Sequence, residues 1–318
     1  MILNWTVKMA LARRRNKLGV LARRAFVLGA VMLSVAPARA DWRTDTGTFR
    51  IGVVMQPGET GAPRRFEGFR ALAAEALSMP VEIFPARDAS ALIDAMATSR
   101  IEYAVFSALG YATAFELCKC VEPLAAPVSH DGATGVRSAL IADTARAARI
   151  SDLEGMPVAV GPENSLGGDL LPSAGFRWRG KPLADSGFDL VPAETTQESL
   201  RLLADGEVAA AFLWEFVRLG SPSAFADGPR AWLDELSPQG FAVLWHSEAI
   251  RFGPHAVRRT LASEAKTAMR RMLLGLARDN PVVYDSVSPD LGGGFEAVVA
   301  DEYRSAAALV TAIGAAEE

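Results

Sequence analysis

The organisation of this chain centres on a glycine-rich stretch, Gly-Pro-Glu-Asn-Ser-Leu-Gly-Gly-Asp-Leu-Leu-Pro (residues 161–172). It follows a short apolar run at 156–160 and leads into two leucines, which predicts a strand, a tight turn and the start of a helix. The first N–H groups of a helix have no partner inside it and lie at the positive end of the helix dipole, so such a turn suits an anion. Gly-rich turns also serve only to connect two elements, and the stretch alone leaves both interpretations open.

The first forty residues have the composition of an export signal. They contain eight Lys and Arg and no acid, followed by an apolar run at 25–35 and by Pro37-Ala38-Arg39-Ala40. A basic region, a short apolar region and an A-x-A motif are typical of a cleaved signal peptide, so we expect the mature chain to begin at Asp41. The run Arg23-Arg24-Ala25-Phe26 is typical of a twin-arginine signal, and an ordinary Sec leader is the alternative.

Removal of this leader, residues 1–40, changes the charge of the protein. The whole chain has 33 basic and 37 acidic residues and a net charge of −4. Without the eight basic residues of the leader, the net charge is −12, which argues against nucleic acid or an anionic membrane surface as a partner. A mature chain of 278 residues is long enough for two compact lobes or one large domain.

Strands and helices alternate along the mature chain. Apolar runs predict strands at 49–55, 81–84, 101–106, 137–142, 157–160, 208–214 and 241–245. Helical spacing predicts helices from Phe66 to Leu77, after an N-cap at Asp88, and after an N-cap at Thr195. A capping box at 151–154 predicts the start of a further short helix. The chain then becomes mainly helical, over 254–277 and 300–313.

This alternation predicts βα units and largely parallel sheets. We expect two α/β lobes joined by crossover segments at 137–142 and 241–245. A ligand would then bind in the crevice between the lobes, because open parallel sheets bind ligands outside the carboxyl ends of their strands.

The two cysteines, Cys118 and Cys120, are separated by a single lysine. In an oxidising compartment the first question is whether they pair, and this spacing closes only a small ring. A soft-metal site is the alternative, but two thiols without a nearby His or third Cys make a poor zinc pattern. We therefore favour structural cysteines, and we expect neither a metal nor another cofactor. His130, His246 and His255 lack metal-like spacing.

Catalytic motifs are not evident. The run Asn164-Ser165-Leu166-Gly167 partly matches a nucleophile elbow, but Glu163 occupies the position where that motif needs its first glycine. Neither a P-loop nor a His-Glu-x-x-His zinc motif occurs. We therefore expect a binding protein rather than an enzyme.

Several short motifs together carry a family resemblance from about Arg50 to Leu309. They are Ile51-Gly-Val-Val with Pro57, Phe106-Ser-Ala-Leu-Gly-Tyr111, Val136-Arg-Ser138, Ser151-Asp-Leu-Glu-Gly155, Asn164 to Pro172, Val243-Leu-Trp-His-Ser247 and Gly294-Phe-Glu with Tyr303. In order and spacing they resemble the periplasmic phosphate-, phosphite- and phosphonate-binding proteins of ABC transporters, the PhnD-like group of type II solute-binding proteins.

The resemblance implies an α/β, two-lobed type II fold that closes on a small ligand about a hinge of two crossover segments. Each lobe would be a βα sheet sandwiched by helices. The first lobe would comprise residues 41–137 and 246–318, and the second would comprise residues 138–245.

The resemblance also assigns ligand-binding residues. Tyr111 matches a family tyrosine whose hydroxyl faces the phosphonate, and Ser165 matches the first hydroxyl of the family's Ser-Thr-Ser-Gly cradle. Leu166 and Gly167 replace the usual Thr and Ser of that cradle, and Gly168 keeps its glycine. Elsewhere, Thr196 stands where a ligand-facing His is common, and Ala209 where an Asp is common.

Three further residues complete the predicted site. Ser107 and Ser138 are candidate ligand donors, and Trp214 ends a strand on the predicted cleft side, where it either stacks on a ligand or packs in the lobe core. Glu215 beside it is a candidate partner for a ligand amine.

The lost hydroxyls bear on the ligand. Hydrogen bonds to a charged group contribute about 1.5–3 kcal/mol each, so two missing donors weaken phosphonate binding unless backbone N–H groups compensate. A phosphonate, phosphite or phosphate is the ligand that the resemblance implies, and a sulfonate, a carboxylate or a larger ligand that packs on Leu166 stays open. The implied partner is an inner-membrane ABC permease, and the protein is expected to be a monomer. A periplasmic sensor or adaptor that reports to a membrane protein is the alternative, because it would share the fold.

Overall fold

The computed structural model describes residues 41–55, 63–221, 228–236 and 240–316. The expected leader lies outside the described residues. Contacts divide the chain into residues 1–45 and 46–318, and of the first unit the structure describes only the start of a short helix, α2 (Trp42–Thr46). None of the described helices combines the length and apolar character needed to span a membrane. The rest of the fold concerns the second unit.

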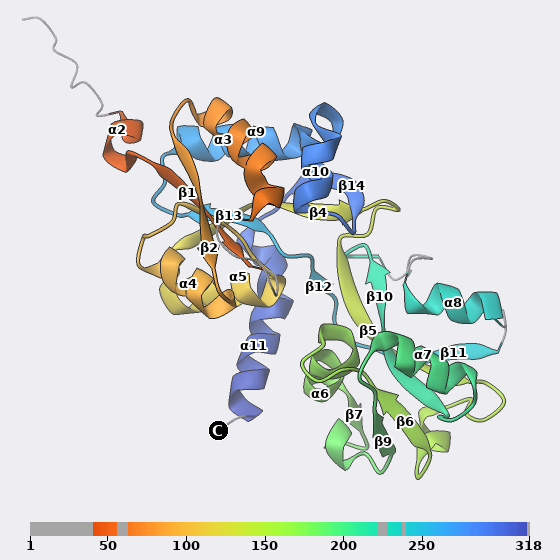
Figure 1. Ribbon diagram of the computed structural model, residues 1–318. Coiled ribbons are helices and arrows are strands. Elements are labelled where there is room, and N and C mark those ends of the chain that lie inside the picture. Colours follow the sequence, from red (N-terminus) through yellow and green to blue (C-terminus); the bar gives the residue numbers. More distant parts are fainter. Residues whose placement is uncertain (1–40, 56–62, 222–227, 237–239, 317–318) are drawn as a thin grey trace, which may run out of the picture. The chain divides into compact units, whose positions relative to one another are not determined.

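The first sheet has six strands in the order β14-β4-β13-β3-β1-β2 (Figure 1). The strands are β1 (Phe49–Val54), β2 (Val81–Ala86), β3 (Tyr103–Val105), β4 (Val121–Ser129), β13 (His255–Arg258) and β14 (Gly292–Ala297). β1 pairs in parallel with β2 and β3, whereas β13 and β14 pair antiparallel with their neighbours. The first three strands confirm the strands expected at 49–55, 81–84 and 101–106.

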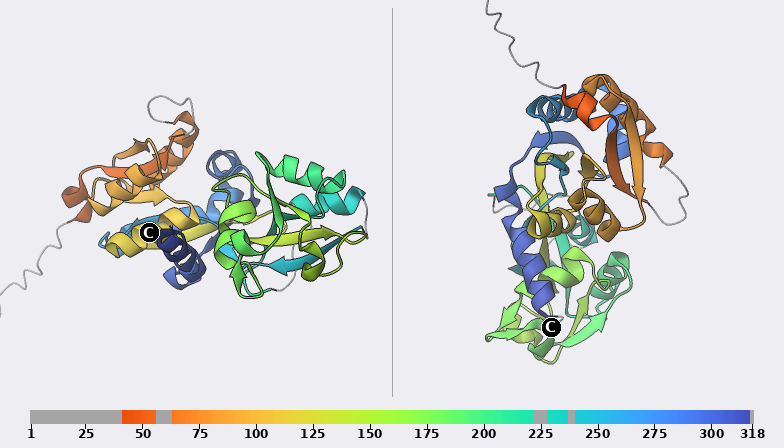
Figure 2. Two further views of the ribbon diagram at one scale, coloured as in Figure 1. Left: turned by 90° about the horizontal axis from the view of Figure 1, so that it is seen from below. Right: turned by 90° about the vertical axis from the view of Figure 1, so that its left-hand side faces the viewer.

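Helices cover both faces of this sheet (Figures 1 and 2). One face carries α3 (Glu67–Leu77), α9 (Ser263–Asp279) and α10 (Pro281–Val287), and the other carries α4 (Ala89–Ala97), α5 (Ala108–Cys118) and α11 (Arg304–Ala316). Asp88 caps α4 as expected, because its Oδ1 accepts a hydrogen bond from the N–H of Ala91 at 2.7 Å. Under α3, the rings of Phe69, Tyr103 and His255 pack with centroids 5.8–5.9 Å apart.

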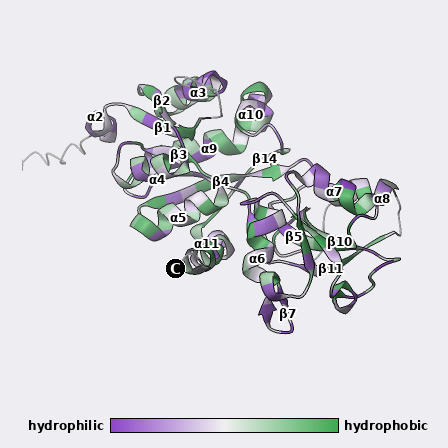
Figure 3. Cartoon of the chain, turned by 60° about the horizontal axis from the view of Figure 1, so that its bottom comes forward, coloured by the Kyte–Doolittle hydropathy of each residue, from purple (hydrophilic) through white to green (hydrophobic). Residues whose placement is uncertain are grey.

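The second sheet has the order β11-β5-β10-β6-β9, with β12 also paired to β5. Its strands are β5 (Gly135–Asp143), β6 (Pro157–Val160), β9 (Asp189–Pro192), β10 (Ala210–Val217), β11 (Phe241–His246) and β12 (Ile250–Arg251). Its helices are α6 (Leu171–Gly175), α7 (Thr196–Ala204) and α8 (Pro229–Leu236). A small hairpin of β7 (Arg177–Trp178) and β8 (Lys181–Pro182) is coloured mostly hydrophilic in Figure 3, in keeping with its exposure.

The chain passes between the two sheets twice. It leaves the first sheet after β4 and returns to it between β12 and β13. The two passes are joined by a hydrogen bond from the N–H of Phe252 to the carbonyl of Thr134, at 3.0 Å. The segments expected to cross, 137–142 and 241–245, instead lie within β5 and β11, which pair antiparallel with each other in the second sheet.

Three sequence-based expectations need correction. The helix expected from about Pro254 begins later, at Ser263, where α9 starts. The first part of the expected helix is instead β13, which lies buried between β3 and β4. A short apolar run buried on both faces has no periodicity that separates a strand from a helix. The sheets are mixed rather than largely parallel. The helix expected at 151–154 is a single 3₁₀ turn (Ile150–Leu153), and Asp152 caps it by accepting from the N–H of Arg149.

The cysteines pair. Cys118, the last residue of α5, forms a disulfide with Cys120, and Lys119 between them adopts a left-handed backbone conformation with φ of 50°. The disulfide confirms the expectation of structural cysteines over a metal site.

Candidate functional site

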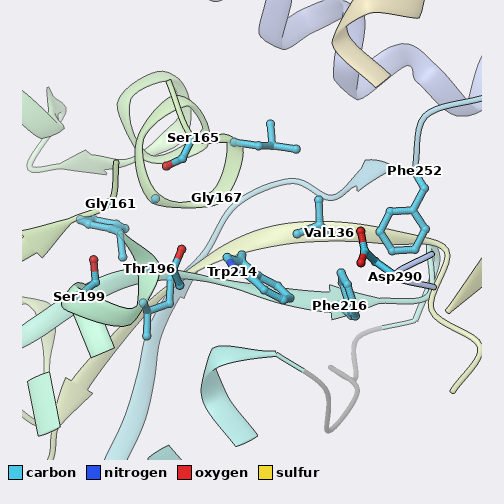
Figure 4. A pocket seen from close by; sticks show the side chains of 14 residues that line it. Val136, Gly161, Ser165, Gly167, Thr196, Ser199, Trp214, Phe216, Phe252 and Asp290 are labelled. Atoms are coloured by element: carbon cyan, nitrogen blue, oxygen red, sulfur yellow. The ribbon is translucent and has the colours of Figure 1, made fainter. Parts of the chain in front are cut away.

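A cavity of about 480 Å³ lies against the second sheet (Figure 4). It is bounded by β10, by the turn that follows β6, by the start of α7, and by two residues outside that sheet, Phe252 and Asp290. The lining residues are Val136, Gly161, Ser165, Leu166, Gly167, Gly168, Thr196, Ser199, Phe212, Leu213, Trp214, Phe216, Phe252 and Asp290.

The glycine-rich turn is held by its own backbone. The N–H of Gly161 donates to the carbonyl of Gly168 at 2.9 Å, and the N–H of Ser165 donates to the carbonyl of Pro162 at 2.9 Å. A Cβ built on Gly168 would lie 2.6 Å from the Cα of Gly161, so no side chain fits at either glycine. Beyond the turn, Leu166–Leu170 form one turn of π-helix that continues into α6.

This turn leaves donors without partners. Within the described part of the chain, the backbone N–H groups of Leu166, Gly167 and Gly168 have no hydrogen-bond acceptor. The Oγ of Ser165 is buried and also has no partner among the described residues. These are the unpaired donors that a helix start presents, and they belong to residues that line the cavity.

A second helix begins at the same part of the cavity. The Oγ1 of Thr195 caps α7 by accepting from the N–H of Glu198 at 3.0 Å, which confirms the expected N-cap. Thr196, the first residue of α7, and Ser199, one turn further on, line the cavity beside the glycine-rich turn (Figure 4). Two helix N-termini therefore give this end of the cavity a positive potential.

Aromatic side chains form the rest of the wall. Trp214 and Phe216 are alternate residues of β10, so they lie on the same face of the sheet. Their ring centroids are 4.9 Å apart, and the ring of Phe252 stands at 86° to that of Phe216, with centroids 5.3 Å apart. Figure 4 shows Asp290 beside Phe252 and Phe216. None of the fourteen lining residues is Lys, Arg or His, and Asp290 is the acid among them.

Glu215 lies on the opposite face of β10 and does not line the cavity. It is 1% exposed and accepts hydrogen bonds from Arg137, at 3.0 Å, and from Nε2 of His246, at 3.1 Å. Burial opposes its charge, but the hydrogen bonds and charges of His246 and Arg137 outweigh burial and lower the pKa of Glu215. Glu215 thus joins β10 to β5 and β11 rather than facing a ligand.

The structure brings six of the nine predicted site residues together. Five of them surround the donors described above, and Trp214 packs against one of these five, Gly167. The six are Ser165, Leu166, Gly167, Gly168, Thr196 and Trp214.

The other three do not line the cavity. Tyr111 packs in the core between α5 and α11, with its ring centroid 4.7 Å from that of Tyr303, and burial raises its pKa to about 12. Its hydroxyl has no partner among the described residues. Ser138 is fully buried, and its Oγ donates to the carbonyl of Leu213. Ser107 is the N-cap of α5, where its Oγ accepts from the N–H of Gly110.

Sequence reasoning missed Phe216, Phe252 and Asp290. Phe216 was accessible to it, because two residues beyond Trp214 in a strand lie on the same face. Phe252 comes from the return pass and Asp290 from the turn between α10 and β14, and only tertiary structure brings them to β10.

Residues 51–303 match the model of one protein family, which is described as "ABC transporter, phosphonate, periplasmic substrate-binding protein". The match covers more than half of the chain. The chain belongs to this family. The members of this phosphonate-binding family are substrate-binding components of transporters rather than enzymes, and the family is periplasmic.

Solved structures share the fold of this family member at low sequence identity. PhnD1 from Prochlorococcus marinus, solved in complex with methylphosphonate, is 14% identical, with a TM-score of 0.51 over 85% of this chain and 99% of its own. XAC2383 from Xanthomonas citri, solved bound to ATP, is 13% identical, with a TM-score of 0.55 over 85% of this chain and 98% of its own. The same protein has also been solved with a chloride ion. These likenesses establish the mixed α/β, two-sheet fold.

Proposed function

We propose that this family member is exported to the periplasm, loses residues 1–40, and works as the monomeric substrate-binding component of an ABC transporter. It binds a small solute with an anionic group, which the turn at 165–168 receives, and delivers it to a membrane permease. The observation that supports this proposal best is the set of unpaired backbone donors at Leu166, Gly167 and Gly168 on the cavity wall.

The backbone replaces the side-chain donors that the family cradle usually supplies. Each hydrogen bond to a charged oxygen contributes about 1.5–3 kcal/mol. Three N–H groups at a helix start, aided by the dipole of α7, are therefore enough to hold a phosphonate or a carboxylate oxygen without an Arg or Lys.

Ser165 adds a further donor. A buried hydroxyl without a partner lowers stability by about 1–3 kcal/mol. An anion oxygen that accepts from its Oγ would relieve that penalty in the bound state only, which favours the complex.

The proposed closing motion involves the two sheets. We propose that they form two lobes, close to the limits at 137 and 245 expected from the sequence, which move about the passes at 130–134 and 252–254. Phe252 and Asp290 would then approach or leave the wall formed by β10, and closure would exclude water from the anion.

A ligand panel tests this function. The mature chain, residues 41–318, is titrated by calorimetry and thermal shift with methylphosphonate, phosphite, phosphate, methanesulfonate and acetate. We expect saturable binding of at least one anion, with a stabilisation of about 2.7 kcal/mol at a hundred times its Kd. The absence of binding by all five would overturn the proposed anion site.

A further inference from the structure

The two ends of the cavity differ in charge. Unpaired N–H groups and two helix starts lie at one end, and Trp214 packs beside them against Gly167. Phe216, Phe252 and the carboxylate of Asp290 lie farther along the cavity, at the other end (Figure 4). A ligand with an anionic group alone would engage only the first end. The side chains of Phe216, Phe252 and Asp290 carry no hydrogen-bond donor, so the second end does not favour a dianion.

The rings form a corner. Phe252 stands nearly perpendicular to Phe216, at 86°, and the indole of Trp214 is inclined to Phe216 by 44°. The ring centroids, 4.9 and 5.3 Å apart, lie at ordinary packing distances for neighbouring aromatic rings, and all three residues line the cavity. A cationic nitrogen within about 6 Å of a ring centroid is attracted to the face of that ring.

The corner is held in place by its neighbours. A Cβ built on Gly167 would lie 2.5 Å from the Cβ of Trp214, and a Cβ built on Gly228 would lie 2.9 Å from Cζ3 of its ring, so the base of the side chain and one part of the ring are closely packed. The backbone of Phe252 is fixed to Thr134 by the hydrogen bond between the two passes. Rings that are already ordered lose little conformational freedom when a ligand binds.

The carboxylate is available to a ligand. Asp290 is exposed, and no hydrogen bond or ion pair joins it to another described residue. A second cavity, of about 380 Å³, shares Thr196, Trp214, Phe216 and Asp290 with the first and adds Trp232. The aromatic surface therefore continues past the carboxylate.

We infer that the ligand carries an alkylated ammonium group, which sits in the corner of Trp214, Phe216 and Phe252 and is neutralised by Asp290. This inference rests on the proposed function, because it places the anionic group of the same molecule at the 165–168 turn. The ligand is then a zwitterion, whose charges lie opposite the matching ends of the cavity. Alkylation matters because a methylated nitrogen is weakly hydrated and prefers π faces to water, whereas a primary ammonium prefers oxygen acceptors.

A pair of probes that differ in charge alone tests the inference. The first is N,N,N-trimethylaminoethylphosphonate, and the second is 3,3-dimethylbutylphosphonate, in which carbon replaces the quaternary nitrogen. We expect the ammonium probe to bind the mature chain at least about tenfold more tightly than its carbon analogue in calorimetry, with a change in tryptophan fluorescence. Equal or tighter binding of the carbon analogue would overturn the inference while leaving the anion site intact.

Variants separate the corner from the turn. Asp290→Asn is expected to weaken binding of the ammonium probe about tenfold without weakening binding of the carbon analogue. Asp285→Asn, at an exposed acid of α10 outside the cavity lining, is expected to change neither affinity. Equal loss of both probes in Asp290→Asn would contradict the inference. Choline, which has no anionic group, is the third probe. Binding of choline without binding of any anion would support an ammonium site at the aromatic corner and overturn the anion site. Binding of no probe would overturn both sites.

Discussion

Gly167 lies directly against Trp214: a Cβ built on the glycine would approach the Cβ of Trp214 to 2.5 Å and its Cα to 3.3 Å. The backbone of the π-helical turn therefore packs directly against β10. This contact fixes the unpaired N–H groups of the turn relative to the aromatic side chains of β10. The glycine that replaces the usual cradle serine thus has a steric role that the sequence pattern did not reveal.

Gly167→Ala should disturb both walls. Because the clashing atoms belong to the backbone and Cβ of a packed strand, relief requires the turn to move, at a cost of about 1–3 kcal/mol in unfolding free energy. Ligand affinity should fall with it. Chemical denaturation and calorimetry measure both quantities. Gly175→Ala is the matched control, since its Cβ would meet only the ring of Trp245 at 3.7 Å, and equal effects of the two variants would contradict the steric account.

Ser165→Ala should separate binding from stability. The Oγ has no partner among the described residues, so its removal should not lower the free energy of unfolding and should raise it by up to about 3 kcal/mol. Affinity for an anionic ligand should fall by about tenfold to a hundredfold, the loss of one charge-assisted hydrogen bond. Ser90→Ala, at an exposed site in α4, is the control. Unchanged affinity in Ser165→Ala would remove the hydroxyl from the proposed site.

His255 should make stability depend on pH. Burial lowers its pKa to about 3, from an ordinary value of 6.5, and its Nδ1 lies 2.5 Å from the hydroxyl of Tyr103. Between these two pKa values, His255 is protonated in the unfolded chain but not in the folded chain. The free energy of unfolding should therefore fall as pH falls from 6.5 toward 3, by about 1.4 kcal/mol per pH unit within that window.

Denaturation at several pH values checks this dependence. His255→Gln should show a shallower slope over the same window, because the variant has no imidazole to protonate. His130→Gln, an exposed histidine, should keep the wild-type slope. A wild-type slope in His255→Gln would show that other groups cause the dependence.

Glu215 should stabilise the second sheet through its charge. Glu215→Gln removes the counter-ion of Arg137, whose side chain is only 12% exposed. Breaking such a pair costs roughly 3 kcal/mol, the low end of the usual range, because His246 is partly exposed. The pKa of Glu215 is lowered from 4.5, so its contribution is present above pH 4.5 and is lost as pH falls through the lower folded value.

The measurement is the difference in unfolding free energy between wild type and variant as a function of pH. It should shrink as pH falls below 4.5. Glu75→Gln, at an exposed position in α3, should show no difference at any pH. A gap between wild type and Glu215→Gln that is the same at pH 7 and pH 3 would refute the ionic explanation.

The sequence predicted elements whose signals are local. The caps at Asp88 and Thr195, the strand before the glycine-rich turn and most βα units depend on a few adjacent residues, and the structure confirms them. The location of β13 was not predictable in this way, because a strand buried on both faces has no alternating pattern. The two passes were misplaced for a related reason, since the apolar runs of β5 and β11 look alike whether they pair within a sheet or connect two sheets.

In the candidate site, too, the sequence predicted only the residues whose signals are local. The turn at 165–168 was found because glycines and a serine after a strand mark a helix start. Phe252 and Asp290 carry no local signal, and their place in the cavity depends on how the return pass and α10 approach β10. Among the aromatic and acidic residues of the cavity, Trp214 was predicted and Phe216 follows from its spacing in the strand, whereas Phe252 and Asp290 could not be predicted from the sequence.

Amide resonances of the turn test the central claim most directly. In a ¹⁵N-labelled mature chain, titration with methylphosphonate and with N,N,N-trimethylaminoethylphosphonate should move the N–H resonances of Leu166, Gly167 and Gly168 downfield and to saturation, as expected for new hydrogen bonds to an anion. The N–H of Gly175, on the same helical segment but outside the cavity, should stay in place. Saturable binding of either probe that leaves the three turn resonances unmoved would contradict the account.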